Sequence, residues 1–506
     1  MFANRLNGEE GRFGDLPPLK NKDLSGEVVT RFAPNPDFVL HLGSIRAAIL
    51  SHDYARKYDG RFLLRFEDTD PRLKKSALEY YEAIRDDLKW LECPWDQEWI
   101  QSDRLSLYYE HAVKLLDQGS AYVCTCEREA FSARISRGEP CPCRLKDPAT
   151  NLDDWRKMLH GGYSEGEAVV RIKTDITHPN PAVRDWPAFR VIDPEKYPHP
   201  RVGTKYRVWP LYNIASAIDD HLLGVTHIFR GKEHLTNAFR QGYVYKYLEW
   251  KYPEAIHYGR LKAVGFTLSK SVMVKQLETG QVKDYSDPRL PTLAALRRRG
   301  YSPNTLRKIV HEMGPRPVDA TLSWDNINAA DRKEVDRIAH RYNFLVDPVP
   351  LDVTGVPGNF EAHLPLHPGQ PELGARTLKV NAEGNKARVW LSGADKGLLA
   401  TSNVLRLMEL FNVEVENADA SPASARFHSQ DYMTARKLGA PLIQWLPEGQ
   451  RIQFQSVMPD ATLATGQAEE NVLAEPVGSI IQMVRFGFAR IDFKDKSQVE
   501  VYYSHR

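Results

Sequence analysis

The hydrophobic pattern is strongest near the start of the chain. Residues 27–32 and 61–66 are short, mainly apolar runs typical of buried strands, whereas residues 45–57 keep their apolar positions mainly on one helical face. Gly60 follows this helix at the position where glycine is favoured, because it adopts positive φ readily. The pattern predicts a β–α–β unit whose helix packs on a parallel sheet.

The loop at residues 33–44 joins the first strand to the helix. It contains two prolines, which fix φ, and Gly43 beside the helix start, where free N–H groups can bind phosphate. The run His41-Leu-Gly-Ser44 alone is weak support for a nucleotide site, since a histidine before a glycine is more often a turn residue. The loop is nevertheless the first place to look for chemistry.

Helical and strand patterns alternate through the middle of the chain. Residues 78–91 and 105–116 have helical spacing, and residues 209–289 return to this alternation with predicted strands at 226–230 and 257–262. Residues 290–345 are helical with charged faces. Beyond residue 347, short alternating runs separated by turn residues predict an all-β region.

Size and charge limit the classes of protein that remain. A chain of 506 residues predicts three or four domains, and a net charge of +2 requires any RNA-binding surface to be a local basic patch. No run of 18 apolar residues occurs, and the N-terminus lacks a basic segment followed by an apolar core. We therefore expect a cytoplasmic protein with no membrane or DNA partner, and a flexible tail at residues 1–26.

Four of the five cysteines form two Cys-x-Cys pairs, Cys124/Cys126 and Cys141/Cys143, with fourteen residues between the pairs. This spacing lets four thiolates converge on one tetrahedral zinc, whereas a disulfide inside Cys-x-Cys would be strained. The alternative is four structural or partly oxidised thiols. The fifth, Cys93, has the pattern of an ordinary buried residue.

Several motifs, in their order and spacing, closely resemble the class I glutamyl-tRNA synthetases. They are Arg31-Phe-Ala-Pro-Asn-Pro36, His41-Leu-Gly-Ser44, Arg65-Phe-Glu-Asp-Thr-Asp-Pro71, Tyr212-Asn-Ile-Ala-Ser216, Gly224-Val-Thr-His-Ile-Phe-Arg-Gly-Lys-Glu-His234 and Thr267-Leu-Ser-Lys-Ser271. In the all-β region, residues 440–447 and 485–492 resemble the paired barrels of the archaeal and eukaryotic branch.

The resemblance implies a multidomain α/β fold. A class I Rossmann-like catalytic domain would be formed by residues 27–120 and 209–289, interrupted by an inserted α+β acceptor-binding lobe at 121–208 that contains the cysteines. A helical connector at 290–346 and a C-terminal β-barrel anticodon-binding domain at 347–506 would follow.

The implied activity is the ATP-dependent ligation of L-glutamate to tRNA(Glu) through glutamyl adenylate, with release of pyrophosphate and AMP. Mg²⁺ would accompany ATP, and a structural Zn²⁺ would occupy the cysteine site. Members of this family generally need tRNA to activate glutamate. Whether tRNA(Gln) is also charged stays open.

The resemblance also assigns roles to individual residues. His41 and Lys270 would be catalytic, because neither step needs a covalent enzyme intermediate and donors to the phosphates suffice. ATP would be bound by His41, Gly43, Ser44, Leu268, Ser269 and Lys270. Glutamate would be bound by Arg31, Asn35, Glu67, Tyr212, Ser216 and Arg230. The broader class I pattern has a second histidine at position 44, so we expect no catalytic role for Ser44 itself.

Two other readings compete with this one. A glutaminyl-tRNA synthetase shares the fold, but a buried Arg230 facing a neutral amide would be left unpaired. A non-catalytic tRNA-binding protein that kept the fold is a second alternative, and the presence of both His41 and Lys270 argues against it.

Overall fold

The computed structural model describes residues 13, 16–21 and 26–506 of the chain. Contacts divide it into two compact units, which are considered separately. Unit 1 comprises Met1–Val274 and Leu306–Ser323, and unit 2 comprises Lys275–Thr305 and Trp324–Arg506. Across the described residues, no helix is both long and apolar enough to cross a membrane.

The predicted flexible tail lies largely outside the described residues. Residues 16–21 are described, and they pack against helix α3 (Ile45–Lys57) instead of extending freely. Leu16 and Leu19 are buried, the Tyr54 hydroxyl donates to the Pro17 carbonyl at 2.8 Å, and Lys57 donates to the Leu16 carbonyl. Two leucines near the chain start therefore have a packing partner on α3, which the polar composition of the segment concealed.

The predicted β–α–β unit is confirmed. Strand β1 (Val29–Phe32) pairs in parallel with β2 (Arg61–Phe66), and α3 connects them with the predicted bounds. A Cβ added to Gly60 would lie 1.9 Å from the Val28 carbonyl oxygen, so the connection from α3 into β2 requires glycine here.

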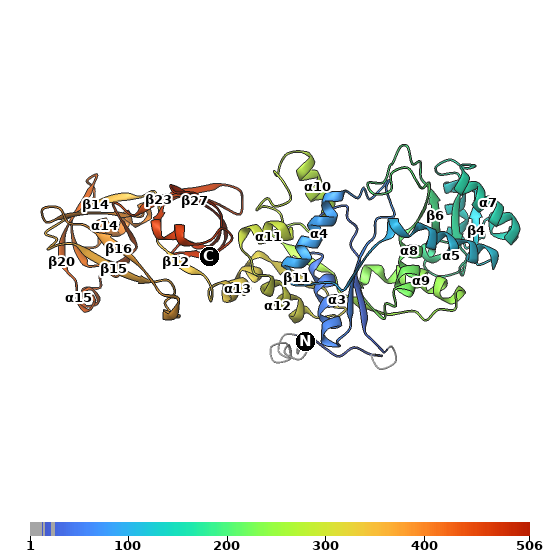
Figure 1. Cartoon of the computed structure of the whole chain (residues 1–506), viewed down its shortest axis with the longest axis horizontal. Coiled ribbons are helices and arrows are strands. Elements are labelled where there is room, and N and C mark those ends of the chain that lie inside the picture. Colours follow the sequence, from blue (N-terminus) through green and yellow to red (C-terminus); the bar gives the residue numbers. More distant parts are fainter. Residues whose placement is uncertain (1–12, 14–15, 22–25) are drawn as a thin grey trace. The chain divides into compact units, whose positions relative to one another are not determined.

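Three further parallel strands lie beside this pair, one in the same sheet and two in a neighbouring two-stranded sheet. Strand β3 (Gln97–Ile100) pairs with β2, while β8 (His227–Gly231) lies beside β1 through a hydrogen bond from the Thr226 N–H to the Val29 carbonyl at 2.8 Å. Strand β9 (Glu254–Tyr258) pairs in parallel with β8. Strands β8 and β9, from the second half of the predicted catalytic domain, therefore lie beside β1 from the first half. The insertion separates the two halves in the sequence (Figure 1).

The insertion forms its own α+β lobe. An antiparallel sheet contains β4 (Ala121–Cys124), β5 (Val169–Ile172), β6 (Pro187–Val191) and β7 (Val208–Pro210). Helices α5 (Leu105–Asp117), α6 (Arg128–Ser136) and α7 (Pro148–His160) accompany it. Trp155, Trp186 and Trp209 are fully buried in its core, which provides the large apolar area that a small lobe needs.

The predicted strand at 257–262 is wrong as a single element. It is divided between β9, which ends at Tyr258, and β10 (Leu261–Val264), because the Gly259 N–H bonds the Arg316 carbonyl at 2.9 Å and turns the chain. Strand β10 then pairs in parallel with β11 (Ala320–Ser323), a partner distant in sequence. The remaining helices of unit 1 are α4 (Leu78–Trp90), α8 (Tyr212–Leu222) and α9 (Leu235–Tyr247).

Arg46, near the start of α3, is fully buried and donates hydrogen bonds to backbone carbonyls. It donates to Gly259 at 2.8 Å, to Gly314 at 2.7 Å and to Arg316 at 3.1 Å. These carbonyls belong to the turn before β10 and to the segment before β11. The first turn of α3 is therefore fixed to two loops that are remote in sequence.

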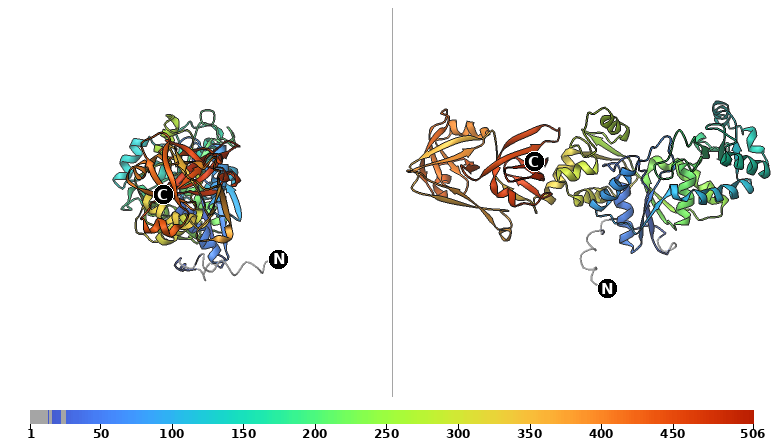
Figure 2. Two further views of the ribbon diagram at one scale, coloured as in Figure 1. Left: turned by 90° about the vertical axis from the view of Figure 1, so that its left-hand side faces the viewer. Right: turned by 45° about the horizontal axis from the view of Figure 1, so that its top comes forward.

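Unit 2 contains the predicted all-β region, with α11 (Leu293–Arg299) and α13 (Trp324–Val335) before it. One seven-stranded sheet contains β12 (His340–Tyr342), β13 (Phe344–Val346), β23 (Arg451–Val457), β24 (Leu463–Glu469), β25 (Ile480–Met483), β26 (Gly487–Lys494) and β27 (Gln498–His505). The other contains β14 (Val349–Thr354), β17 (Lys386–Leu391), β18 (Val404–Leu407), β19 (Asn412–Asn417), β20 (Ala423–Ser429), β21 (Leu442–Ile443) and β22 (Trp445–Pro447). Both sheets curl around apolar cores (Figure 2).

A two-stranded sheet and two short helices complete unit 2. They are β15 (Phe360–Pro365), β16 (Ala375–Val380), α14 (Lys396–Thr401) and α15 (Tyr432–Lys437). Helix α12 (Pro303–Met313) lies within the stretch 290–346 that was expected to form a helical connector. Residues 306–323 of this stretch belong to unit 1, and the rest of it belongs to unit 2. Helix α10 (Lys270–Glu278) crosses the boundary between the two units in the chain.

Candidate active site

A cavity of about 500 Å³ lies at the carboxyl ends of β1 and β8, the edge at which open parallel sheets bind ligands. Six of the predicted site residues line it: Arg31, Asn35, Gly43, Glu67, Tyr212 and Arg230. They come from the loop after β1, the end of β2, the start of α8 and the end of β8. The fold thus brings together residues that are spread over two hundred positions of the sequence.

The loop at residues 33–44 forms one side of this site. The Gly43 N–H donates to Nδ1 of His41 at 3.1 Å, so the neutral imidazole carries its proton on Nε2. Burial and, secondarily, Lys270 lower the pKa of His41 to about 4, which keeps the ring neutral near pH 7. A Cβ at Gly43 would lie 2.6 Å from the His41 ring, so glycine is required for this contact.

Lys270 begins α10 and forms an ion pair with Asp37 of the loop at residues 33–44. The predicted Lys270 is therefore brought to the loop that contains the predicted His41, Gly43 and Ser44. Leu268 and Ser269 lie in the turn before Lys270 and do not line the cavity. Ser44 is the N-cap of α3, but its side chain makes no capping hydrogen bond.

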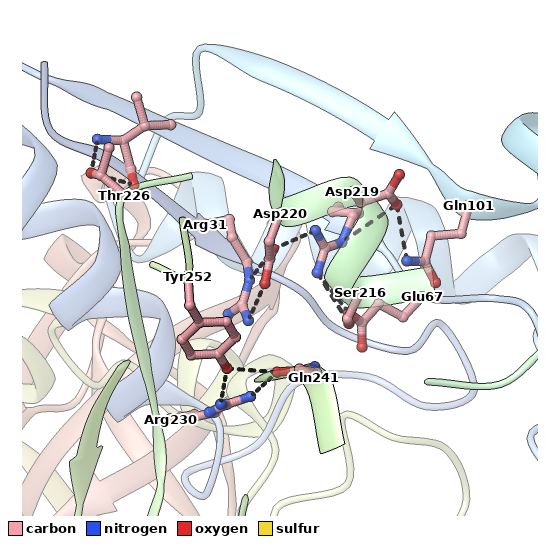
Figure 3. Close-up of polar contacts among 12 residues, drawn as sticks. Arg31, Glu67, Gln101, Ser216, Asp219, Asp220, Thr226, Arg230, Gln241 and Tyr252 are labelled. Carbon is pink, nitrogen blue, oxygen red and sulfur yellow. Dashed lines mark hydrogen bonds and ion pairs between the residues drawn. The ribbon is translucent and has the colours of Figure 1, made fainter. Parts of the chain in front are cut away.

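A buried network of charged side chains contacts residues that line the cavity. Asp220, on α8, accepts from Arg31 at 3.1 and 3.4 Å and from Arg65 at 2.6 Å (Figure 3). Burial alone would raise the pKa of Asp220, but the two arginines outweigh it and hold the pKa below its usual value. Neither Arg65 nor Asp220 was predicted as a site residue.

Glu67 is held in place by two groups from this network. The Ser216 hydroxyl donates to Glu67 at 2.6 Å, and Arg65 donates to the same carboxylate oxygen at 2.9 Å (Figure 3). Ser216 is fully buried and does not line the cavity, unlike Glu67. Ser216 therefore contacts a cavity residue rather than the cavity itself.

Arg230 has a different environment from the other two arginines. It is 5% exposed, and its three nitrogens donate to Gln241 at 3.0 Å, Tyr252 at 2.8 Å and His257 at 3.2 Å. Among the residues that the structure describes, no carboxylate oxygen lies within 4.0 Å of its nitrogens. A buried guanidinium facing the cavity thus has no ion-pair partner among the described residues.

Asn35 adds an unpaired acceptor to the same cavity. Its Oδ1 atom is buried and has no hydrogen-bond partner within the described part of the chain. A buried amide oxygen without a donor costs free energy, about 1–3 kcal/mol, unless a ligand or water supplies one. The cavity consequently offers both a cation without a directly paired carboxylate and an unsatisfied acceptor.

The four cysteines of the inserted lobe converge at a second site. Their sulfur atoms all lie within 4.8 Å of one another, with Cys124–Cys141 and Cys126–Cys143 both separated by 3.7 Å. These distances exclude disulfides, but they match the edge of a tetrahedron with Zn–S bonds of about 2.3 Å, which is about 3.8 Å. The donor set and its geometry fit zinc.

The comparisons with known proteins agree with this architecture. Residues 27–337 match the profile of tRNA synthetases class I (E and Q), catalytic domain, and residues 339–428 match that of the corresponding anti-codon binding domain. The parallel sheet with its converging loops is therefore that of a class I aminoacyl-tRNA synthetase. Within this class, the chain belongs to the family of the E and Q synthetases, which comprises the glutamate and glutamine enzymes.

Similar proteins include two curated archaeal enzymes. The chain is 49% identical to the glutamate--tRNA ligase of Thermococcus kodakarensis, over 100% of this chain and 87% of that protein. It is 49% identical to the glutamate--tRNA ligase of Pyrococcus abyssi, over 97% and 85%. A solved glutamate-tRNA synthetase from Elizabethkingia anophelis aligns with a TM-score of 0.46 at 20% identity, covering 62% of this chain and 71% of that one.

Proposed function

We propose that this chain ligates L-glutamate to the 3′ end of tRNA(Glu). The glutamate α-carboxylate attacks the α-phosphorus of ATP and displaces pyrophosphate, and a ribose hydroxyl of tRNA then takes the glutamyl group and displaces AMP. The observation that carries this proposal is Arg230, a buried cation in the cavity of an E and Q synthetase whose protein partners are all neutral. A glutamate side chain supplies the missing charge, whereas glutamine does not.

The loop at residues 33–44 and Lys270 act on ATP. His41 donates from Nε2 to the α-phosphate as negative charge develops there, and Lys270 exchanges Asp37 for the β- and γ-phosphates. Gly43 keeps the backbone open to the adenine. Mg²⁺ accompanying ATP would supply further positive charge to the phosphates, beside that of Lys270.

The opposite side of the cavity orients glutamate. Glu67 and the unsatisfied Asn35 oxygen accept from the α-ammonium, and the positive charge of Arg230 pairs with the side-chain carboxylate through an Nη N–H that its neutral partners leave free. Two nitrogens of Arg31 are already on Asp220, which leaves Nη1 for the α-carboxylate. Tyr212 lines the cavity, while Ser216 acts indirectly by holding Glu67.

Aminoacylation of transcripts tests the proposal directly. Purified protein with ATP, Mg²⁺ and radiolabelled glutamate is expected to charge tRNA(Glu), and radiolabelled glutamine is expected to give little product. tRNA must be present in every assay, because enzymes of this family generally need tRNA to activate glutamate. An absence of ATP–pyrophosphate exchange without tRNA would therefore decide nothing. A tRNA(Gln) transcript in parallel determines whether charging extends to that tRNA. Charging by glutamine alone would contradict the proposal.

We assign tRNA binding to the inserted lobe and to the two large sheets of unit 2. The lobe formed by residues 121–208 binds the acceptor end, and the sheets of unit 2 read the anticodon. The second assignment is supported by the match of residues 339–428 to the anti-codon binding domain profile. The net charge of +2 restricts both contacts to local basic patches.

The cysteine site holds one structural zinc. Four thiolates complete a tetrahedral shell and leave no position for a reactive water, so the metal fixes the lobe instead of taking part in the reaction. Cys124 ends β4 and Cys143 lies in a short turn of helix, so the site connects the start of the lobe's sheet to the following loop.

Elemental analysis of protein purified without chelator is expected to find about one zinc per chain. Cys141→Ser should lose most of the metal, because three thiolates bind it less tightly. Cys93→Ser is the matched control and should keep a full equivalent, since Cys93 lies outside the cluster. The site would be rejected if wild-type protein contained no zinc and the four cluster thiols could all be titrated freely.

A further inference from the structure

The three groups that hold Arg230 share one property, which is that none of them is charged. Gln241 comes from α9, Tyr252 from the loop before β9, and His257 from β9 itself. We infer that Gln241, Tyr252 and His257 form a neutral cage that fixes the Arg230 guanidinium while leaving its charge for the substrate. Gln241 is thereby a positioning residue for the choice of glutamate over glutamine. This inference rests on the function proposed above.

The hydrogen bonds of the cage have a defined direction. The Tyr252 hydroxyl donates to Gln241 Oε1 at 2.8 Å, so its oxygen lone pairs face Arg230 Nη2, also at 2.8 Å (Figure 3). The Gln241 oxygen accepts a second hydrogen bond from Arg230 Nη1 at 3.0 Å. A guanidinium only donates, so the amide must present its oxygen here. One Gln241 atom thus orients both the arginine and the tyrosine.

The third contact comes from an imidazole that is kept neutral. Arg230 Nε donates to Nε2 of His257 at 3.2 Å, which requires an unprotonated nitrogen. Burial, followed by Arg230 and His234, lowers the pKa of His257 to about 4. Burial also raises the pKa of Tyr252, and Arg230 offsets only part of that rise. Near pH 7 all three acceptors are neutral.

The neighbouring arginines, unlike Arg230, are paired with carboxylates. Arg31 and Arg65 share the Asp220 carboxylate, and Arg65 also pairs with Glu67 at 2.9 Å. Glu67 and Glu233 line the same cavity as Arg230, but neither comes within 4.0 Å of its nitrogens. In a region rich in acids, the one arginine that faces the substrate side chain is held by neutral oxygen and nitrogen atoms.

Gln241→Glu tests this directly because it is nearly isosteric and places a carboxylate on Arg230. We expect kcat/KM for glutamate to fall by at least about 10-fold, with the change mainly in KM, while KM for ATP changes little. The value for glutamine should fall less, so the glutamate-to-glutamine ratio drops. Gln241→Met removes the acceptor without adding charge and should leave that ratio closer to wild type.

Two controls separate this outcome from general effects. Lys246→Gln makes the same change in net charge on the exposed side of α9 and should retain wild-type kinetics with glutamate. His257→Glu adds a carboxylate on the Nε side of Arg230 at a half-buried position and should reproduce the loss of selectivity even where Gln241→Glu folds poorly.

The outcomes for the cage and for the proposed function are distinct. If wild-type protein charges tRNA with glutamate but Gln241→Glu and His257→Glu keep the wild-type ratio, the neutral cage is refuted and the function stands. If wild-type protein does not use glutamate at all, the proposed function fails first and the inference fails with it. A drop in the ratio with both variants, absent in Lys246→Gln, supports the cage.

Discussion

Lys270→Ala is expected to lower the rate of adenylate formation by about 10²-fold or more. Lys270 is the cation that the structure brings to the loop at residues 33–44, where it pairs with Asp37. The triphosphate carries more negative charge than a carboxylate and takes this partner when ATP binds. Removing the lysine leaves developing charge on the leaving pyrophosphate without a donor, and it also leaves Asp37 as an uncompensated repulsive charge.

Single-turnover adenylate formation at saturating glutamate, ATP and tRNA measures this effect. Lys262→Ala provides a matched control, because Lys262 is an exposed lysine on β10, a few residues before the same turn. Its rate should stay near that of wild type. The affinity of Lys270→Ala for tRNA should change little. Near-normal adenylation by Lys270→Ala would remove the role assigned to this residue.

Arg230→Cys is expected to cost about 2–5 kcal/mol in glutamate binding, since it strips the counter-charge from a partly buried carboxylate. Glutamine needs no opposite charge and should lose far less. The ratio of glutamate to glutamine kcat/KM should therefore fall by at least about 10-fold, which corresponds to about 1.4 kcal/mol. Gln241, Tyr252 and His257 are neutral, so none of them can replace the lost charge.

Steady-state aminoacylation with each amino acid gives this ratio. Arg260→Cys, at an exposed arginine in the turn after β9, makes the same substitution outside the cavity and should leave the ratio unchanged. If Arg230→Cys raises both KM values together and keeps the ratio, then Arg230 binds a group common to both substrates. Selectivity would then be assigned to Arg31.

The sequence predicted the catalytic core well wherever local pattern and motif coincide. The bounds of α3 and β2 follow from helical and strand periodicity that tertiary contacts reinforce. The division at Gly259 was missed because apolar residues on both sides resemble one continuous strand. The bend depends on the Arg316 carbonyl, whose proximity no local pattern encodes.

Six cavity-lining residues were predicted from motifs, but Arg65 and Asp220, which hold two of them in place, were not. Asp220 lies near the end of α8 in a pair of acids, a pattern typical of an exposed helix terminus, although it is 1% exposed. Its arginine partners lie 155 and 189 residues earlier in the chain. The available signal was the apolar sequence Ile214 to Ile218 leading into two acids, which implies that those acids share the buried environment of the helix.

The backbone contacts of Arg46 have a consequence for which changes the segment before β11 can accept. Arg46 binds the carbonyl groups of Gly259, Gly314 and Arg316, so its hydrogen bonds depend on the backbone position of those loops and not on their side chains. Side-chain substitutions along the segment before β11 would leave these carbonyls in place, whereas an insertion or deletion there would shift them away from α3. The position of the first turn of α3 thus depends on the length of this segment rather than on its side chains.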